Sequence, residues 1–138
     1  MITGIGVDLC SISRIRNALA SVHFRESIFS LNEIAYAESK GAKRFGSYAA
    51  CFAAREAFIK ASRLQLTSVM LGRNFELVRN DDGAPTVRLC GNLAARYPED
   101  EAKVFVSISH EGDYACAMVV IEKINDEVIH NGNSYAGF

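Results

Sequence analysis

Apolar residues alternate with glycine and one acid at the start of the chain, and this alternation predicts a strand over residues 2–9. The apolar residues Ile5, Val7 and Leu9 point to one face of this strand. Gly4, Gly6 and Asp8 point to the other face. Glycine inside a strand often marks a close approach by a ligand or another backbone. Asp8 therefore has two interpretations, as a functional carboxylate or as the cap of the helix that follows.

The apolar positions then repeat with helical spacing, at Ile12, Ile15, Leu19 and Val22. We expect this helix to begin after Ser11 or Ser13. A second helix is predicted from the capping box formed by Ser30 and Glu33, and it is expected to end near Gly41.

The longest uninterrupted run of helix-forming residues covers residues 48–63. Small side chains recur along one line of this predicted helix, at Ala50, Ala54, Ala57 and Ala61. A neighbouring line carries Glu56, Lys60 and Arg63 beyond apolar residues. Taken alone, Glu56 and Lys60 are typical of a solvated pair at i, i+4, worth roughly 0.2–0.5 kcal/mol.

After residue 63 the apolar positions alternate again, which predicts strands. The predicted strands cover residues 75–78, 86–89, 104–109 and 114–121. Asp82-Gly83 marks the first turn and residues 111–113 the second, while Asn92 is expected to cap a short helix that stops at Pro98. The order of strand, helices and then strands predicts an α+β fold, with an antiparallel sheet packed against the long helix.

Length and charge narrow the class of protein. The 138 residues suit one domain, which we expect over residues 1–124, followed by a polar, poorly ordered tail at 125–138. A net charge of −1 argues against bulk nucleic-acid binding. The chain shows neither a signal-peptide pattern nor an apolar run near the roughly 20 residues that span a membrane, so we expect a cytoplasmic location. The widely spaced cysteines fit reduced thiols: Cys10, Cys51, Cys90 and Cys116.

Four short motifs together resemble one known family. They are G-I-G-V-D ending at Asp8, the capped turn ending at Glu33, F-A-A-R-E-A-F-I-K-A around Glu56, and S-I-S-H ending at His110. Their order and spacing, from about Ile2 to Glu122, resemble the holo-[acyl-carrier-protein] synthases, the small type of 4′-phosphopantetheinyl transferase. The resemblance implies transfer of the 4′-phosphopantetheine arm of coenzyme A to a serine of an acyl carrier protein, releasing adenosine 3′,5′-bisphosphate. It also implies the fold of that family and an active homotrimer with sites between subunits.

The same resemblance assigns catalytic roles to Asp8, Glu56 and Lys60. The two carboxylates match the family's metal ligands, and Mg²⁺ takes its remaining ligands from water and substrate phosphates. Lys60 lies one helical turn beyond Glu56, where its ammonium would stabilise a phosphate oxygen. The base that activates the carrier serine is either Glu56 or a metal-bound water.

Contacts with the two substrates are also implied. The residues expected to bind coenzyme A are Arg55, Lys60, Ser109 and His110. Arg14 matches the arginine that the family presents to its acidic carrier, with Arg25 and Phe24 assisting. The carrier belongs to fatty-acid or polyketide synthesis, and the sequence does not distinguish these. The alanine stripe is expected at or near the interface between subunits.

Three positions depart from the family pattern. Arg55 stands where lysine is usual, and residues 62–71 lack the usual glycine-rich turn. Cys10 occupies the place of a third carboxylate in the larger relatives, and we expect it to be a buried thiol without a catalytic role. Two other functions remain open at this point. One is a different Mg²⁺-dependent enzyme that cleaves pyrophosphates, and the other is a non-catalytic binding module in which Asp8 and Glu56 are structural.

Overall fold

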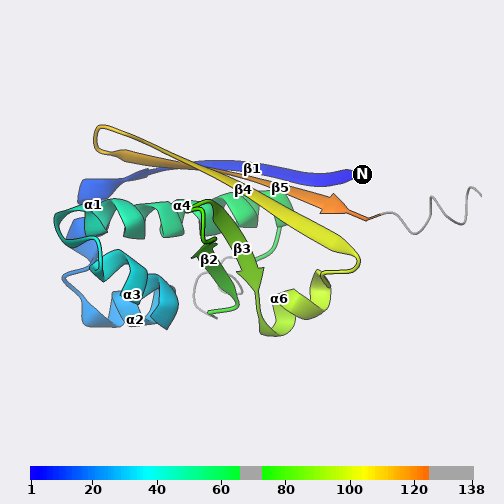
Figure 1. The fold of residues 1–138 in the computed structure, drawn as a ribbon, viewed down its shortest axis with the longest axis horizontal. Coiled ribbons are helices and arrows are strands. Elements are labelled where there is room, and N and C mark those ends of the chain that lie inside the picture. The colour runs from blue at the N-terminus through cyan, green and yellow to red at the C-terminus, as the bar shows by residue number, and fades with distance from the viewer. Residues whose placement is uncertain (66–72, 125–138) are drawn as a thin grey trace, which may run out of the picture.

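The structure, a computed structural model, describes residues 1–65 and 73–124. The strands are β1 (Ile2–Ser11), β2 (Phe75–Arg79), β3 (Pro85–Leu89), β4 (Ala102–Glu111) and β5 (Tyr114–Lys123). The helical elements are α1 (Ile12–Ala18), α2 (Val22–Ile28), α3 (Leu31–Glu38), the short 3-10 helix η1 (Gly41–Lys43), α4 (Arg44–Ser62) and α6 (Gly91–Arg96) (Figure 1). The polar tail expected at 125–138 lies outside the described residues, so the domain boundary after residue 124 stays a prediction. Most of residues 62–71, where the family's glycine-rich turn is missing, also lie outside them.

The predicted α+β architecture is confirmed. An antiparallel sheet with strand order β1-β5-β4 lies along one side of α4, and α2, α3, α6 and the β2–β3 hairpin lie on the other (Figure 1). The central helix is buried on most of its sides, and the core is built around it. Among the described residues, no helix is both long enough and apolar enough to cross a membrane.

The glycine face of β1 packs directly on α4. A Cβ atom at Gly4 would collide with the carbonyl of Ala61, and one at Gly6 with the carbonyl of Ala57. The close backbone approach expected at these glycines is therefore real, and the neighbour is a helix of the same chain. The whole alanine stripe of α4 is buried within the protomer, so its small side chains pack inside one chain, and the subunit interface expected at or near it stays a prediction.

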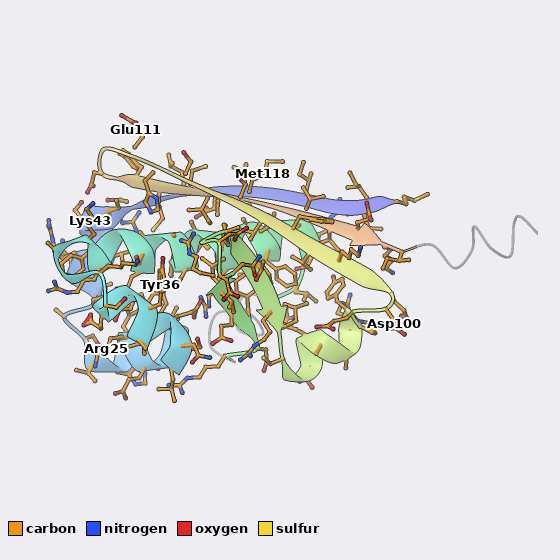
Figure 2. The ribbon with its side chains drawn as sticks, viewed as in Figure 1. Arg25, Tyr36, Lys43, Asp100, Glu111 and Met118 are labelled. Atoms are coloured by element: carbon orange, nitrogen blue, oxygen red, sulfur yellow. The ribbon has the colours of Figure 1, made fainter. Side chains whose placement is uncertain are left out.

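The opposite face of the same sheet is apolar and exposed. Ile5, Val7 and Leu9 are 63%, 56% and 62% exposed, and they are joined across the sheet by Met118 and Phe105. Figure 2 shows Met118 projecting from the side of the sheet away from α4. Contiguous apolar surface of this kind marks an interaction site.

Most helix starts follow the sequence, with some corrections. The capping box of Ser30 and Glu33 is present, and Ser11 caps α1 as expected. The apolar repeat predicted as one helix is divided, because Ser21 accepts a hydrogen bond from the Phe24 N–H and starts α2. The long helix begins at Arg44, four residues earlier than expected, and α6 has Cys90 rather than Asn92 at its N-cap.

Candidate active site

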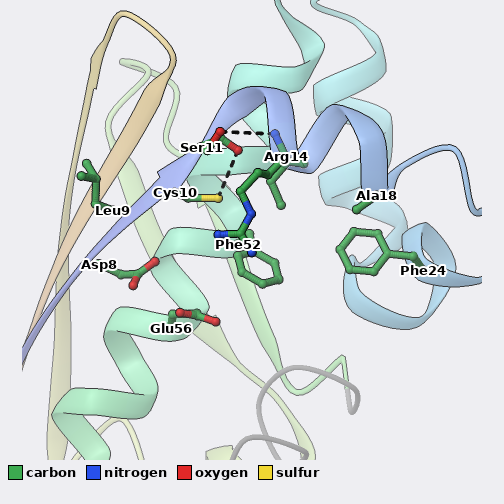
Figure 3. Close-up of a pocket in the computed structure, with 10 residues that line it drawn as sticks. Asp8, Leu9, Cys10, Ser11, Arg14, Ala18, Phe24, Phe52 and Glu56 are labelled. Atoms are coloured by element: carbon green, nitrogen blue, oxygen red, sulfur yellow. Dashed lines mark hydrogen bonds between the residues drawn. The ribbon is translucent and has the colours of Figure 1, made fainter.

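A pocket of about 380 Å³ opens where β1, α1, α2 and α4 meet (Figure 3). Asp8 enters it from β1, Glu56 from α4, Arg14 from α1 and Phe24 from α2. Phe52 forms part of the wall one helical turn before Glu56, a spacing that could have identified it from the sequence. The pocket thus joins two carboxylates, a cation and apolar rings from four elements.

Asp8 and Glu56 lie side by side in this pocket (Figure 3). The alternative role of Asp8 as a helix cap is wrong, because Ser11 occupies the N-cap position of α1. Burial, and then the negative charge of Asp8, raise the pKa of Glu56 above its ordinary value. Desolvation and a neighbouring like charge both disfavour the ionised form of a carboxylate, which accounts for the direction of this change.

This carboxylate pair fits a divalent cation. Mg²⁺ prefers oxygen ligands, and a cation would relieve the repulsion that raises the pKa of Glu56. Residues 1–65 and 73–124 contain no group of three or more His, Cys, Asp or Glu side chains able to hold a metal. A cation held here would therefore take only two protein carboxylates and would need further ligands from substrate or water.

Lys60 belongs to the carboxylate cluster and not to a separate surface pair. Its ammonium donates to the carbonyl of Val7 at 2.9 Å and lies 3.4 Å from Oδ1 of Asp8. The side chain of Lys60 is 56% exposed, whereas that of Asp8 is 11% exposed, so the ammonium covers the outer edge of the site. The ion-pair partner of Lys60 is thus Asp8 rather than Glu56, which corrects the expected solvated i, i+4 pair.

Cys10 also lines this pocket, but its thiol is unreactive at neutral pH. Burial, followed by the charges of Asp8 and Glu56, raises the pKa of the Cys10 thiol to about 11. The thiol therefore stays protonated at neutral pH, and a protonated thiol is a poor nucleophile and metal ligand.

Arg55 does not reach this pocket. It is fully buried on another side of α4, where its guanidinium forms a two-pronged ion pair with Glu33 and donates to the carbonyls of Cys51 and Phe75. A side chain with no exposed surface cannot contact coenzyme A in this structure, so the expected ligand-binding role is replaced by a structural one. Its ion-pair partner is Glu33, which the sequence identified only as part of a capping box.

Ser109 and His110 lie near the end of β4, and they point to opposite faces of the sheet. Ser109 shares the exposed face with Leu9, across Cys116. His110 faces inward, and its Nε2 lies 3.1 Å from the carbonyl of Gly46. Because a carbonyl oxygen can only accept a hydrogen bond, Nε2 of His110 carries the proton in this contact and donates it to Gly46.

His110 borders a second cavity, of about 480 Å³, that sequence reasoning missed. Its basic lining residues come from α1, from η1 with its N-cap, and from β2: Arg16, Lys40, Lys43 and Arg79. Lys40 and Arg79 stack on the ring of Tyr36, at 4.6 and 5.5 Å from its centre. This concentration of positive charge around an open cavity suits a phosphate-bearing ligand.

The residues expected at the carrier interface are divided. Arg14 and Phe24 both line the carboxylate pocket. Arg25 instead lines a different cavity together with Tyr48 and Arg44. The structure therefore groups Arg14 with Phe24 and separates Arg25 from them.

The predicted site residues thus form two clusters within one chain. Asp8, Glu56 and Lys60 lie beside the edge strand β1, whereas His110 lies on the opposite edge strand β4. The two cavities share no lining residue.

Comparison with known proteins identifies the family. A profile of the 4′-phosphopantetheinyl transferase superfamily matches residues 4–119. A holo-[acyl-carrier-protein] synthase from Methylobacterium sp. (strain 4-46) is 40% identical over 134 residues, covering 92% of this chain and 98% of the relative.

Solved structures agree with this result. A holo-(acyl-carrier-protein) synthase from Bacillus anthracis, in complex with CoA (3′,5′-ADP), superposes with a TM-score of 0.74 at 31% identity, covering 91% of this chain and 99% of the other. A CoA complex of the corresponding protein from Chronobacterium ammoniagenes gives a TM-score of 0.75 at 28% identity, covering 88% and 98%. With its sequence, its fold and its paired carboxylates in agreement, the chain belongs to the 4′-phosphopantetheinyl transferase superfamily.

Proposed function

We propose that the chain transfers the 4′-phosphopantetheine group of coenzyme A to a serine hydroxyl of an apo acyl carrier protein, with Asp8 and Glu56 holding Mg²⁺. The observation that carries this proposal is the pocket in which the two carboxylates meet, with Lys60 ion-paired to Asp8. A relative with 40% identity is named a holo-[acyl-carrier-protein] synthase, and two similar structures are complexes with coenzyme A. The reaction belongs in the cytoplasm, where coenzyme A and acyl carrier proteins meet.

The reaction moves one phosphorus from one oxygen to another. The serine oxygen bonds to the phosphorus nearest the pantetheine arm, and the bond from that phosphorus to the adenosine 5′-phosphate oxygen breaks. Mg²⁺ would supply charge neutralisation at the pyrophosphate. Lys60, already at the edge of the site, places its ammonium where charge redistributes during transfer.

The serine proton must leave as the new bond forms. Its acceptor is Glu56 or a metal-bound water. The raised pKa of Glu56 suits proton transfer near neutral pH better than an ordinary carboxylate would. A divalent cation would lower that pKa again, which favours water in the metal-bound state.

A complete site requires two subunits in this proposal. Asp8 and His110 line separate cavities at opposite edges of the sheet in one chain, and a coenzyme bound between two copies would touch Asp8 of one copy and His110 of the other. The exposed apolar face around Val7 and Met118 provides a surface on which copies can associate, and Leu9 and Ser109 lie on that face. We propose a homotrimer, as the family resemblance implies, in which the basic cavity around His110 binds coenzyme phosphates.

Charge substitution tests this assembly. Val7→Lys places a charge in the middle of the exposed apolar face without touching the carboxylate pocket. Sedimentation should then show monomers, and transfer activity should fall with the loss of the trimer. Arg96→Glu, an exposed charge reversal on α6, is the matched control. A fully active monomer, whether of the wild type or of Val7→Lys, would refute the two-subunit site.

Carrier docking is proposed at the rim of the carboxylate pocket. Arg14 is exposed there beside the half-buried Phe24, a combination that suits an acidic partner with an apolar anchor. Arg14→Glu should raise the KM for the carrier by much more than the KM for coenzyme A. Equal changes in both constants would remove Arg14 from the docking surface.

Mass spectrometry tests the reaction itself. An apo carrier protein incubated with the enzyme, coenzyme A and Mg²⁺ should gain the mass of one phosphopantetheine group, and excess chelator should prevent this. Hydrolysis of coenzyme A without modification of the carrier would favour the alternative pyrophosphate-cleaving enzyme. Binding without any chemistry would favour the non-catalytic module.

A further inference from the structure

The turn between β4 and β5 carries an acid that holds the start of α1. The carboxylate of Asp113 accepts hydrogen bonds from the hydroxyls of Ser11 and Ser13, at 2.9 and 2.6 Å, and from the N–H of Ser13 at 3.0 Å. Its backbone carbonyl accepts another from the N–H of Ile12 at 2.7 Å. These hydrogen bonds, which we call the Asp113 clamp, join the tip of the hairpin to the first turn of α1.

The clamp satisfies groups that the start of a helix leaves without partners. The N–H groups of Ile12 and Ser13 donate to Asp113, and that of Arg14 donates to the hydroxyl oxygen of Ser11 at 3.3 Å. The hydroxyl of Ser11 donates in turn to Asp113, so the acid also orients the cap. Helix α1 has only seven residues, and isolated helices shorter than about 12–15 residues are barely stable. The position of its first turn therefore depends on a residue from the other end of the chain.

Asp113 is ionised when it makes these contacts. The hydrogen bonds from Ser13, and then that from Ser11, hold the pKa of Asp113 below its ordinary value. The side chain is therefore a carboxylate at neutral pH, with both oxygens available as acceptors. Hydrogen bonds to an ionised acceptor are stronger than those between neutral groups, which suits a clamp on an exposed surface.

The clamp lies beside the carboxylate pocket but outside it. Ser11 and Arg14 line the pocket, whereas Asp113 is not among the described residues that do so. Figure 3 shows the side chain of Arg14 extending from α1 toward Phe52. Because the N–H of Arg14 is bonded to Ser11, a shift of the first turn would carry the guanidinium with it. Asp113 can thus influence the rim of the pocket through α1 without touching a substrate there.

We propose that Asp113 is a positioning residue for the carrier: the Asp113 clamp fixes the first turn of α1, so that Arg14 already faces the rim of the pocket when the carrier docks. This inference rests on the proposed function and on the docking role of Arg14. A group that is ordered before binding adds affinity, because its ordering entropy is not lost on association. The carboxylates of Asp8 and Glu56 are held by β1 and α4, so the clamp should affect carrier affinity more than the chemical step.

Steady-state kinetics of Asp113→Ala test this role. The substitution removes the three side-chain hydrogen bonds and leaves the one to the backbone carbonyl. With an apo acyl carrier protein of fatty-acid synthesis as substrate, the KM for the carrier should rise about three- to tenfold while kcat stays nearly unchanged. Asp113→Asn keeps one acceptor oxygen and should give a smaller rise. Glu111→Gln, an exposed acid on the same hairpin, is the matched control and should leave the KM for the carrier unchanged.

A double-mutant cycle shows whether Asp113 acts through Arg14. In the Arg14→Ala protein, Asp113→Ala should no longer raise the KM for the carrier, because the positioned group is gone. A rise that persists in full in that background would overturn the proposal. So would an unchanged KM in Asp113→Ala with only a lower thermal midpoint, since a purely structural role predicts that result.

The wild-type protein, assayed in parallel by mass spectrometry, separates this inference from the proposed function. A wild type that does not modify the carrier would contradict both. A wild type that transfers normally, beside an Asp113→Ala variant with an unchanged KM, would overturn the positioning role alone. An Arg14→Ala variant with an unchanged KM for the carrier would overturn the docking role of Arg14 and the positioning role together, while the transfer reaction would stand.

Discussion

Removing either partner of the buried ion pair between Arg55 and Glu33 should destabilise the protein severely. Both side chains are almost fully buried, and the carboxylate also accepts hydrogen bonds from the N–H groups of Ser30 and Leu77. The pair thus joins α3, α4 and β2 at one point. Breaking a buried pair by removing one partner costs about 3–5 kcal/mol. That cost is a large part of the total stability of an ordinary domain, about 5–15 kcal/mol.

Two substitutions isolate the charge from other effects. Glu33→Gln keeps a side chain suited to the capping box but places an amide N–H₂ beside the guanidinium or beside the Leu77 N–H. Arg55→Met preserves volume and leaves the carboxylate buried without a cation. We expect each to cost about 3–5 kcal/mol, and we expect the double variant to lose about 0.5–3 kcal/mol less than their sum.

Urea denaturation at a fixed protomer concentration measures these costs, because the stability of an oligomer depends on concentration. The control is Arg96→Met, an exposed arginine in α6, which should change stability by about 0.5 kcal/mol or less. A loss below about 1 kcal/mol for Arg55→Met would refute the argument, since such a value falls well short of a buried pair. Strict additivity in the double variant would show that the two side chains are not coupled.

Three further predictions follow from the site. Gly6→Ala should cost about 1–3 kcal/mol, because its Cβ would collide with the Ala57 carbonyl; Gly46→Ala, whose Cβ has 3.7 Å of room, is the control in thermal denaturation. Lys60→Met should lower kcat on the order of 10²–10³-fold while barely changing the thermal midpoint, and an unchanged kcat would return Lys60 to a surface role. Because the pKa of Glu56 is raised on folding, the folded metal-free protein loses stability as pH rises through that pKa. The Glu56→Gln variant should therefore have a higher free energy of unfolding than the metal-free wild type at neutral pH, and this difference should vanish in acid. Added Mg²⁺ should also remove the difference, because it stabilises the wild type.

Local sequence signals predicted the local features of the fold well. The capping box at Ser30, the turn at Asp82-Gly83 and the alternation in β1 each depend on neighbouring residues only, and all three are present. The pairing of Asp8 with Glu56 was inferred from a family resemblance rather than from local pattern, and the structure brings the two together.

The orientation of α4 could not be read from its sequence. An amphipathic helix reveals its inner face through its apolar period, but ten of the nineteen residues of α4 are buried, on several sides. Arg55 and Glu56 are neighbours in sequence, and only the packing shows that one enters the core while the other enters the pocket. The orientation of β1 could not be predicted from its sequence either. Its glycine face, rather than its apolar face, packs on the core, because a Cβ atom there would collide with the backbone of α4.

The pairing of β1 with β5 has a consequence for the order of events during protein synthesis. Leu9 pairs with Cys116, so among the described strands β1 hydrogen-bonds only to β5, which is synthesised after all the others. The glycine face can meet α4 earlier, but the ladder that fixes Asp8 in register must wait for nearly the entire chain. Contacts between such distant segments form slowly, and until they do β1 lacks its neighbour in the sheet. A nascent or truncated chain that stops before residue 114 should therefore depend on chaperones and lack the carboxylate pocket.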